Sequence, residues 1–409
     1  MTVTAPGSPG PHSRTGPTAL GSSGFSLVEL MVAITLGLLL TAGMVQLFTS
    51  TRVTFNTNQA LARVQENGRF AMELLKRELR PVSSRGFCAG RLEITNHLNE
   101  GCSEFPSGIF LGDVGVTGWE FDGTGRSDEF SLPDSLVPGD TARGKWSSNE
   151  GDSLPTILEN RAAPGSDILV VRRFSPSGVS VDENKNNTQI DLEGFKDCFS
   201  PDCRNPEPGD IVLITNCASG ADLFQQSKAQ SLSAGLRKPT MNCSSAGPGN
   251  KPPGPNPWST EYDESAQVFF VTQTAYFIGF RGDDREQPGL YQLDLARNQA
   301  TELVEGVESM QVLYGFSNDG ASGGDGQSVD FWRTADEIPA DGWRQVIALR
   351  VSLLMRSPDP ADADATEQTY ALFSDDPSLE LTLTANGDGR LRQPFSTAVA
   401  LRNQQLVIE

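Results

Sequence analysis

Histidine and positive charge are both scarce in this chain. Its 409 residues include two histidines, 32 Lys and Arg, and 52 Asp and Glu, which gives a formal net charge of −20. Binding to a nucleic-acid backbone needs a basic surface, so this balance argues against nucleic acid as a partner. A zinc site needs clustered Cys and His, yet no C-x-x-C pair occurs and no histidine lies beside a cysteine pair. We therefore expect no metal and no cofactor.

Cysteines are few, but their number is even. All six follow residue 80, and they are Cys88, Cys102, Cys198, Cys203, Cys217 and Cys243. An even set suits an oxidising compartment such as the periplasm, with up to three disulfides. Six cysteines allow 15 pairings, so the sequence leaves the connectivity open. Pairing of nearest neighbours would give Cys88–Cys102, Cys198–Cys203 and Cys217–Cys243.

The longest apolar run covers residues 25–48, and Glu29 is its one ionisable side chain. As a helix, 24 residues are long enough to cross a hydrocarbon core of roughly 30 Å. A secretory signal peptide would have a shorter apolar region and a small-residue cleavage site after it, which residues 46–52 do not offer. A carboxylate inside such a run is costly in lipid, so Glu29 is by default a functional residue.

The start of this run carries a short motif. Gly24, Phe25 and Glu29, followed by the apolar residues, resemble the cleavage and methylation motif of type IV pilins and type II secretion pseudopilins. The resemblance implies that a prepilin peptidase cuts between Gly24 and Phe25, that Phe25 becomes N-methylated, and that Glu29 is used in assembly. Residues 1–24 are then a leader peptide on the cytoplasmic side. The alternative is an ordinary signal anchor in which Glu29 occurs by chance.

The pattern predicts that the helix continues through residues 49–80 as an amphipathic segment. One apolar stripe follows steps of seven and four residues, through Val53, Ala60, Val64, Ala71, Leu75 and Leu79. Pro81 ends it, because proline disfavours helix in the residue before it. Residues 52–80 carry six Lys or Arg and three Glu, whereas residues 81–409 carry a net charge of about −23. A basic stalk and an acidic head suit the stacking of subunits.

The rest of the chain reads as β-structure. Residues 81–260 are rich in loops, with buried-strand candidates at 167–173 and 210–217. Residues 261–409 form a clearer β-rich region. Its expected strands cover 267–280, 289–295, 307–316 and 345–356.

Several separate segments resemble the PilW family, large minor pilins of type IV pili. These segments are residues 60–71, 303–315, 350–354 and 395–403. The resemblance implies an α+β, pilin-like fold, in which a long N-terminal helix packs on a β-rich periplasmic head.

It also implies a function without catalysis by the chain itself, namely assembly or priming of a type IV pilus. The partners would be the prepilin peptidase, other minor and major pilins, and a pilus-tip adhesin. The protein would be a single-pass protein of the inner membrane, and would reach the pilus or cell surface after assembly. Two alternatives stay open: a type II secretion minor pseudopilin, and a surface adhesin or ligand-binding protein on a pilin anchor.

Two further patterns could indicate chemistry. Residues 320–324 fit G-x-S-x-G, the motif of a serine nucleophile, but no amphipathic helix follows and only His97 remains as a base beyond the leader. Two acidic runs could supply oxygen ligands for Ca²⁺, yet neither has the EF-hand spacing. The two acidic runs are Asp319, Asp325 and Asp330, and Asp359, Asp362 and Asp364. We interpret these two runs as solvated acidic turns.

Overall fold

The computed structural model describes most of the chain, with gaps. The described residues are 26–82, 94–99, 115–133, 145–148, 154–186, 189–195, 204–226, 236–237, 248–251, 258–281, 287–317, 328–339, 342–361 and 366–401. They fall into two compact units that divide between Phe55 and Asn56. The first helix contributes to both units, and the second unit, the head, contains all the strands.

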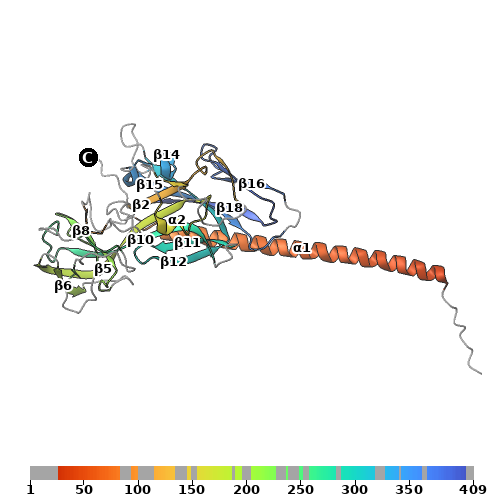
Figure 1. Ribbon diagram of the computed structural model, residues 1–409, viewed down its shortest axis with the longest axis horizontal. Helices are drawn as coiled ribbons and strands as arrows, with labels where there is room; N and C mark the ends of the chain where they lie inside the picture. The colour runs from red at the N-terminus through yellow and green to blue at the C-terminus, as the bar shows by residue number, and fades with distance from the viewer. Residues whose placement is uncertain are drawn as a thin grey trace, which may run out of the picture. The chain divides into compact units, whose positions relative to one another are not determined.

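One long helix precedes a series of strands (Figure 1). In chain order the elements are α1 (Leu27–Leu79), β1 (Ile94–Asn96), β2 (Val116–Phe121), β3 (Glu129–Ser131), β4 (Trp146–Ser147), α2 (Thr156–Glu159), β5 (Ile168–Asn186), β6 (Gln189–Phe195), β7 (Ile211–Thr215), β8 (Ala221–Gln225), β9 (Leu236–Arg237), β10 (Gln267–Phe280), β11 (Pro288–Asp294), β12 (Gln299–Glu305), β13 (Val307–Phe316), β14 (Phe331–Arg333), the 3₁₀ turns η2 (Ala335–Glu337) and η3 (Gly342–Gln345), β15 (Val346–Arg356), β16 (Gln368–Leu372), β17 (Leu381–Ala385) and β18 (Arg392–Ala400).

The α+β class predicted from the sequence is confirmed. Helix α1 spans 53 residues without a proline and ends at Leu79, two residues before Pro81. Lys76 and Arg77 in its last turn suit the negative end of the helix dipole. The expected strands at 267–280 and 307–316 match β10 and β13 at both ends.

The strands of the described residues form three sheets. The largest has eleven strands, in the order β1-β8-β7-β10-β5-β2-β4, with the β11–β12 hairpin on β10 and β6–β9 on β5. A second sheet has the order β14-β13-β15-β18, and a third the order β16-β17-β3. Strand β10 pairs antiparallel with both β5 and β7. The segments on either side of residue 260 therefore share one sheet, and the loop-rich region contains the 19-residue strand β5.

Both faces of the central strands are buried, which explains their nearly continuous apolar sequences. In β5, Leu169 and Val171 belong to the core that includes α1, whereas Ile168 and Val170 face a second core on the opposite side. Strand β10 alternates in the same way. Strands β13 and β15 divide their side chains between the first core and a third, which lies against the three-stranded sheet.

Helix α1 packs on the first core through one stripe. Its buried residues are Val64, Gly68, Ala71, Met72, Leu75 and Leu79, so the predicted stripe is confirmed from Val64 onward. It is wrong at Val53, which is 54% exposed and lies in the other unit. An ion pair adds to the apolar contact, since Arg173 Nη2 lies 2.5 Å from Glu78 Oε2.

Gly68 is a point of close approach between α1 and β18. A Cβ atom built on Gly68 would lie 2.3 to 2.6 Å from ring atoms of Phe395, well inside van der Waals contact. The absence of a side chain therefore lets the Phe395 ring lie directly on the helix backbone. At Gly43, by contrast, a Cβ would meet nothing within 4 Å.

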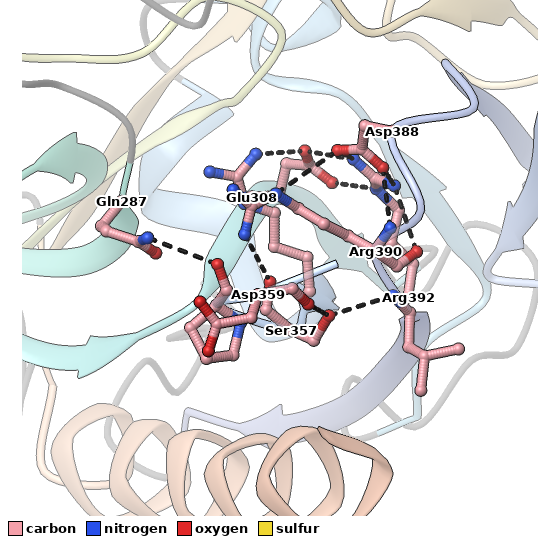
Figure 2. A network of polar contacts seen from close by, with 10 residues as sticks. Gln287, Glu308, Ser357, Asp359, Asp388, Arg390 and Arg392 are labelled. Carbon is pink, nitrogen blue, oxygen red and sulfur yellow. Dashed lines mark hydrogen bonds and ion pairs between the residues drawn. The ribbon is translucent and has the colours of Figure 1, made fainter. Parts of the chain in front are cut away.

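A buried ionic cluster holds β18 to its neighbours (Figure 2). Glu308 on β13 accepts hydrogen bonds from Arg356 Nη1 at 3.1 Å and from Arg392 Nε and Nη2 at 2.5 and 3.0 Å. Asp388 accepts from the other side of Arg392, at 2.7 and 2.8 Å. Arg390 donates to the carbonyl of Ser357 at 3.1 Å. We call Glu308, Arg356, Asp388 and Arg392 the arginine clamp; it connects β13, β15, β18 and the turn before β18.

We expect Gly68→Leu to destabilise the head by about 1–3 kcal/mol, because the new side chain has no space beside Phe395. This loss should exceed the gain in helix propensity, which is about 1 kcal/mol for replacing a glycine. Urea unfolding of the full chain in detergent micelles, followed by tryptophan fluorescence, measures it. Gly43→Leu is the matched control and should leave head stability unchanged. Equal stability of the two variants would contradict the close approach.

We expect Glu308→Ala to destabilise the head by about 3–5 kcal/mol, because it leaves Arg356 without its carboxylate in a buried site. The side chains of Glu308 and Arg392 are only 4% and 5% exposed. The same unfolding measurement tests this, with the exposed Glu129→Ala on β3 as control. If both variants lose the same small amount, the clamp is not a stabilising element.

Candidate functional site

The first half of α1 is apolar on all sides. Among the described residues it is the one helix long and apolar enough to cross a membrane. Its large apolar side chains between Leu27 and Phe48 are 51% to 74% exposed. A helix that is hydrophobic all round is stable only where it is surrounded by lipid or by other helices.

Polar groups within this segment bond to their own backbone. Thr35 Oγ1 donates to the carbonyl of Val32 at 2.9 Å, and Thr41 Oγ1 donates to that of Gly37 at 2.7 Å. Such bonds satisfy a hydroxyl where no water is present. The threonines therefore do not prevent this segment from lying in lipid.

Glu29 lies in the first turn of α1 and bonds to the start of its own helix. Its Oε2 accepts from the backbone N–H of Ser26 at 3.0 Å, while Ser26 Oγ accepts from the N–H of Val28 at 3.2 Å. This reciprocal pattern is a capping box, which satisfies amides that a helix start leaves without partners. The spacing S-x-x-E at residues 26–29 is the sequence signal that indicates this arrangement. Gly24 and Phe25 lie outside the described residues.

One predicted cysteine falls within the described residues. Cys217 follows β7 and takes part in a disulfide; its partner lies outside the described residues. The backbone of Cys217 has a φ of 62°, and its N–H donates to Thr215 Oγ1 at 3.0 Å. The nearest-neighbour pairings stay predictions, because Cys88, Cys102, Cys198, Cys203 and Cys243 also lie outside the described residues.

The serine motif and most of the acidic residues named above also lie outside the described residues. Of the latter, Asp330 and Asp359 are described; Asp330 precedes β14, and Asp359 follows β15 near the arginine clamp (Figure 2). Among the described residues, no group of three or more His, Cys, Asp or Glu is arranged to hold a metal ion.

His97 is part of a polar cluster that centres on a buried carboxylate. Its Nε2 contacts Asp222 Oδ1, and Asp222 Oδ2 accepts from Ser259 Oγ at 2.8 Å and Tyr262 Oη at 2.5 Å. Burial raises the pKa of Asp222, but these hydrogen bonds outweigh it and lower the pKa below its ordinary value. A catalytic triad needs the serine hydroxyl on the imidazole, whereas here it donates to the carboxylate. The cluster joins β1, β8 and the segment at 258–262.

These observations define a membrane-anchored, pilin-like protein: an N-terminal apolar helix, a carboxylate in its first turn, and a β-rich head on its distal half. Two family models match the chain. Residues 20–45 match the prokaryotic N-terminal methylation motif, and residues 275–403 match type IV pilus-assembly protein W, PilW. Comparison with curated proteins and with solved structures gave no match.

The two matches support a PilW-like type IV pilin, a minor pilin in type IV pilus assembly. Its N-terminal motif implies processing by a prepilin peptidase, and pilus assembly implies other pilins as partners. The PilW match runs from β10 to beyond β18, so it includes the strand that carries Phe395 and the arginine clamp. The predicted resemblance is confirmed over residues 303–315, 350–354 and 395–403, whereas residues 60–71 lie outside both matches.

We expect no free thiols in the denatured, unreduced chain, because all six cysteines follow the membrane segment and their number is even. Reaction with a thiol-specific reagent in denaturant counts them. Cys217→Ser should leave one free thiol and lower head stability, typically by about 2–5 kcal/mol for a native disulfide. Peptide mapping then identifies the partner of Cys217. Six free thiols in the wild-type chain would contradict both the disulfides and the oxidising compartment.

Proposed function

We propose that this minor pilin is anchored in the inner membrane by residues 25–48, with the residues that follow, the head included, in the periplasm. We also propose that it joins or primes the filament after cleavage between Gly24 and Phe25. The observation that carries the proposal is Glu29, the one carboxylate in the apolar segment of α1 up to Phe48, which is exposed on all its faces. A charge in that position is costly unless a partner compensates it.

The mature N-terminus supplies such a partner. Cleavage gives Phe25 an α-amino group, which stays cationic near neutral pH even when N-methylated. Glu29 follows Phe25 by four positions in the sequence and can pair with this amine or with the amine of a neighbouring subunit. An ion pair in low dielectric is far stronger than one in water, and leaving one member unpaired costs several kcal/mol. The carboxylate therefore guides a subunit into register, while the surrounding apolar residues contribute non-specific packing.

Further partners follow from this role. We infer contact with major pilins, with other minor pilins and with an adhesin at the pilus tip, and presence on the pilus or cell surface after assembly. The PilW match over the head favours a pilus over a type II secretion pseudopilus. The chain acts as a structural subunit in this proposal, with no catalysis of its own.

We expect Glu29→Ala to be inserted and cleaved but to co-purify with partner pilins about tenfold less, because a loss of about 1.4 kcal/mol or more in pairing gives that factor. Glu29→Gln should show most of the same defect, since it keeps the shape and loses the charge. The measurement is co-purification from membranes, with mass spectrometry of each mature N-terminus to check processing.

Glu66→Gln is the matched control, because Glu66 is exposed on the distal half of α1 and should assemble normally. Full assembly of both Glu29 variants would show that apolar packing alone carries the helix into the bundle. A functional chain that keeps residues 1–24 would overturn the processing step.

A further inference from the structure

Three consecutive residues before β5 join the largest sheet to the four-stranded sheet. Gly165 accepts hydrogen bonds at its carbonyl from Ser309 Oγ and Gln311 Nε2, both at 3.0 Å. Asp167 donates its N–H to the carbonyl of Met310 at 2.8 Å. Polar contacts to β13 therefore add to the apolar core that the two sheets share.

The Asp167 carboxylate bridges the two sheets directly. Its Oδ1 accepts from the N–H of Phe121 on β2 at 3.1 Å, and its Oδ2 accepts from the N–H of Val312 on β13 at 2.8 Å. The side chain is buried, and Asp167 as a whole is 2% exposed. Both backbone donors would lose their acceptor if this carboxylate moved.

A second buried carboxyl group, that of Glu120 on β2, lies against Asp167. Glu120 is 4% exposed, and the two side chains are within hydrogen-bonding reach of each other. Thr124 Oγ1 donates to Glu120 Oε1 at 3.4 Å, while Oε2 has no donor among the described residues. Two buried carboxylates in contact cannot both be charged without a large cost, so one must hold a proton.

The charged and titratable groups around the pair do not remove this cost. Asp336 of η2 adds a further negative charge. Arg126 lines the same cleft, but its guanidinium is engaged by Glu337 at 2.5 Å. Tyr314 on β13 is fully buried, and its pKa is raised well above the ordinary value by burial and by the two carboxyl groups. Among the described residues around the pair, we therefore find no available cation that would stabilise the ionised form of both acids.

The proton belongs on Glu120. Asp167 accepts two backbone N–H bonds, at 3.1 and 2.8 Å, which favour its charged form, whereas Glu120 accepts one backbone bond, from Ala335, and a longer one from Thr124 at 3.4 Å. Burial raises the pKa of both carboxyl groups, and it raises the pKa of Glu120 well above its usual range. The neutral carboxyl of Glu120 then donates to the Asp167 carboxylate, and so helps to hold the bridging side chain in place.

We propose that Glu120 and Asp167 form a proton-sharing pair that keeps the two sheets of the head together, and that loss of the shared proton at alkaline pH loosens this junction. The cleft that they line lies beside Arg126, whose side chain is 33% exposed. Water therefore has a route along which the proton can leave. Ionisation of both acids would set two negative charges against each other next to Asp336.

The sign of the pH dependence follows from the raised pKa values. In the unfolded chain both acids ionise near pH 4, whereas burial raises the pKa of both in the folded head, so the proton on Glu120 is retained well above that pH. The folded state binds more protons over this interval, so stability is highest at acid pH and falls as pH rises through it. One retained proton changes the unfolding constant by roughly tenfold per pH unit.

The experiment is urea unfolding of the full chain in detergent micelles between pH 5 and pH 9, for wild type, Glu120→Gln and Glu129→Gln. A glutamine at 120 still donates to Asp167 but cannot lose a proton. We expect Glu120→Gln to keep the stability of the wild type at pH 5 and to be at least tenfold less unfolded than the wild type at pH 9. Glu129→Gln changes an exposed acid and should follow the wild-type curve.

Hydrogen exchange of the Val312 and Phe121 amides adds a local measurement. At pH 9 both amides should exchange at least tenfold faster in the wild type than in Glu120→Gln, which corrects for the intrinsic effect of pH on exchange. The same pH dependence in wild type and Glu120→Gln, or equal exchange of these amides in both, would overturn the proposal. If Glu129→Gln also removed the pH dependence of stability, the proposal would be overturned as well, because the effect would then come from overall charge.

Discussion

The head depends on burying one stripe of α1. Residues from Val64 to Leu79 complete a core to which both the largest and the four-stranded sheets contribute side chains, from β5, β10, β13 and β15. Without the helix, apolar residues of two sheets would face water, and Tyr276 and Leu353 would lose their cover. The same helix begins with a segment that has no polar face at all. One continuous helix therefore has a first segment suited to lipid and a later segment that packs on a protein core.

The sequence was most informative where a physical requirement leaves a long, regular pattern. The apolar run at 25–48, the stripe from Val64 and the proline at 81 predicted α1 to within two residues at its start and correctly at its end. Strands buried on both faces, such as β10 and β13, are continuous apolar runs and were also predicted well. The motif at Gly24, Phe25 and Glu29 indicated the pilin class, because few other proteins need an acid in that position.

Other features depend on contacts between residues far apart in the chain. Strand β5 was predicted only from its apolar first third, because the polar remainder is ordered by pairing with β10 and β6. From the sequence alone, Gly68 is expected only to weaken the helix. Its role depends on the ring of Phe395, which packs on it from 327 positions later in the chain. The arginine clamp and the Glu120–Asp167 pair bring together side chains whose spacing carries no local pattern. The capping box, by contrast, was present in the sequence and was overlooked.

The attachment of α1 to β18 has a mechanical consequence. Filaments carry tension, and a pull along α1 enters the head where the helix is held, through Glu78 with Arg173 and through the Phe395 ring on Gly68. Phe395 lies three positions from Arg392 on the same strand, so force that reaches this ring passes directly to the buried guanidinium and its two carboxylates. Strands β15 and β18 pair along nine residues and share this force in shear. The closing strand is therefore the part of the head that has to resist stretching.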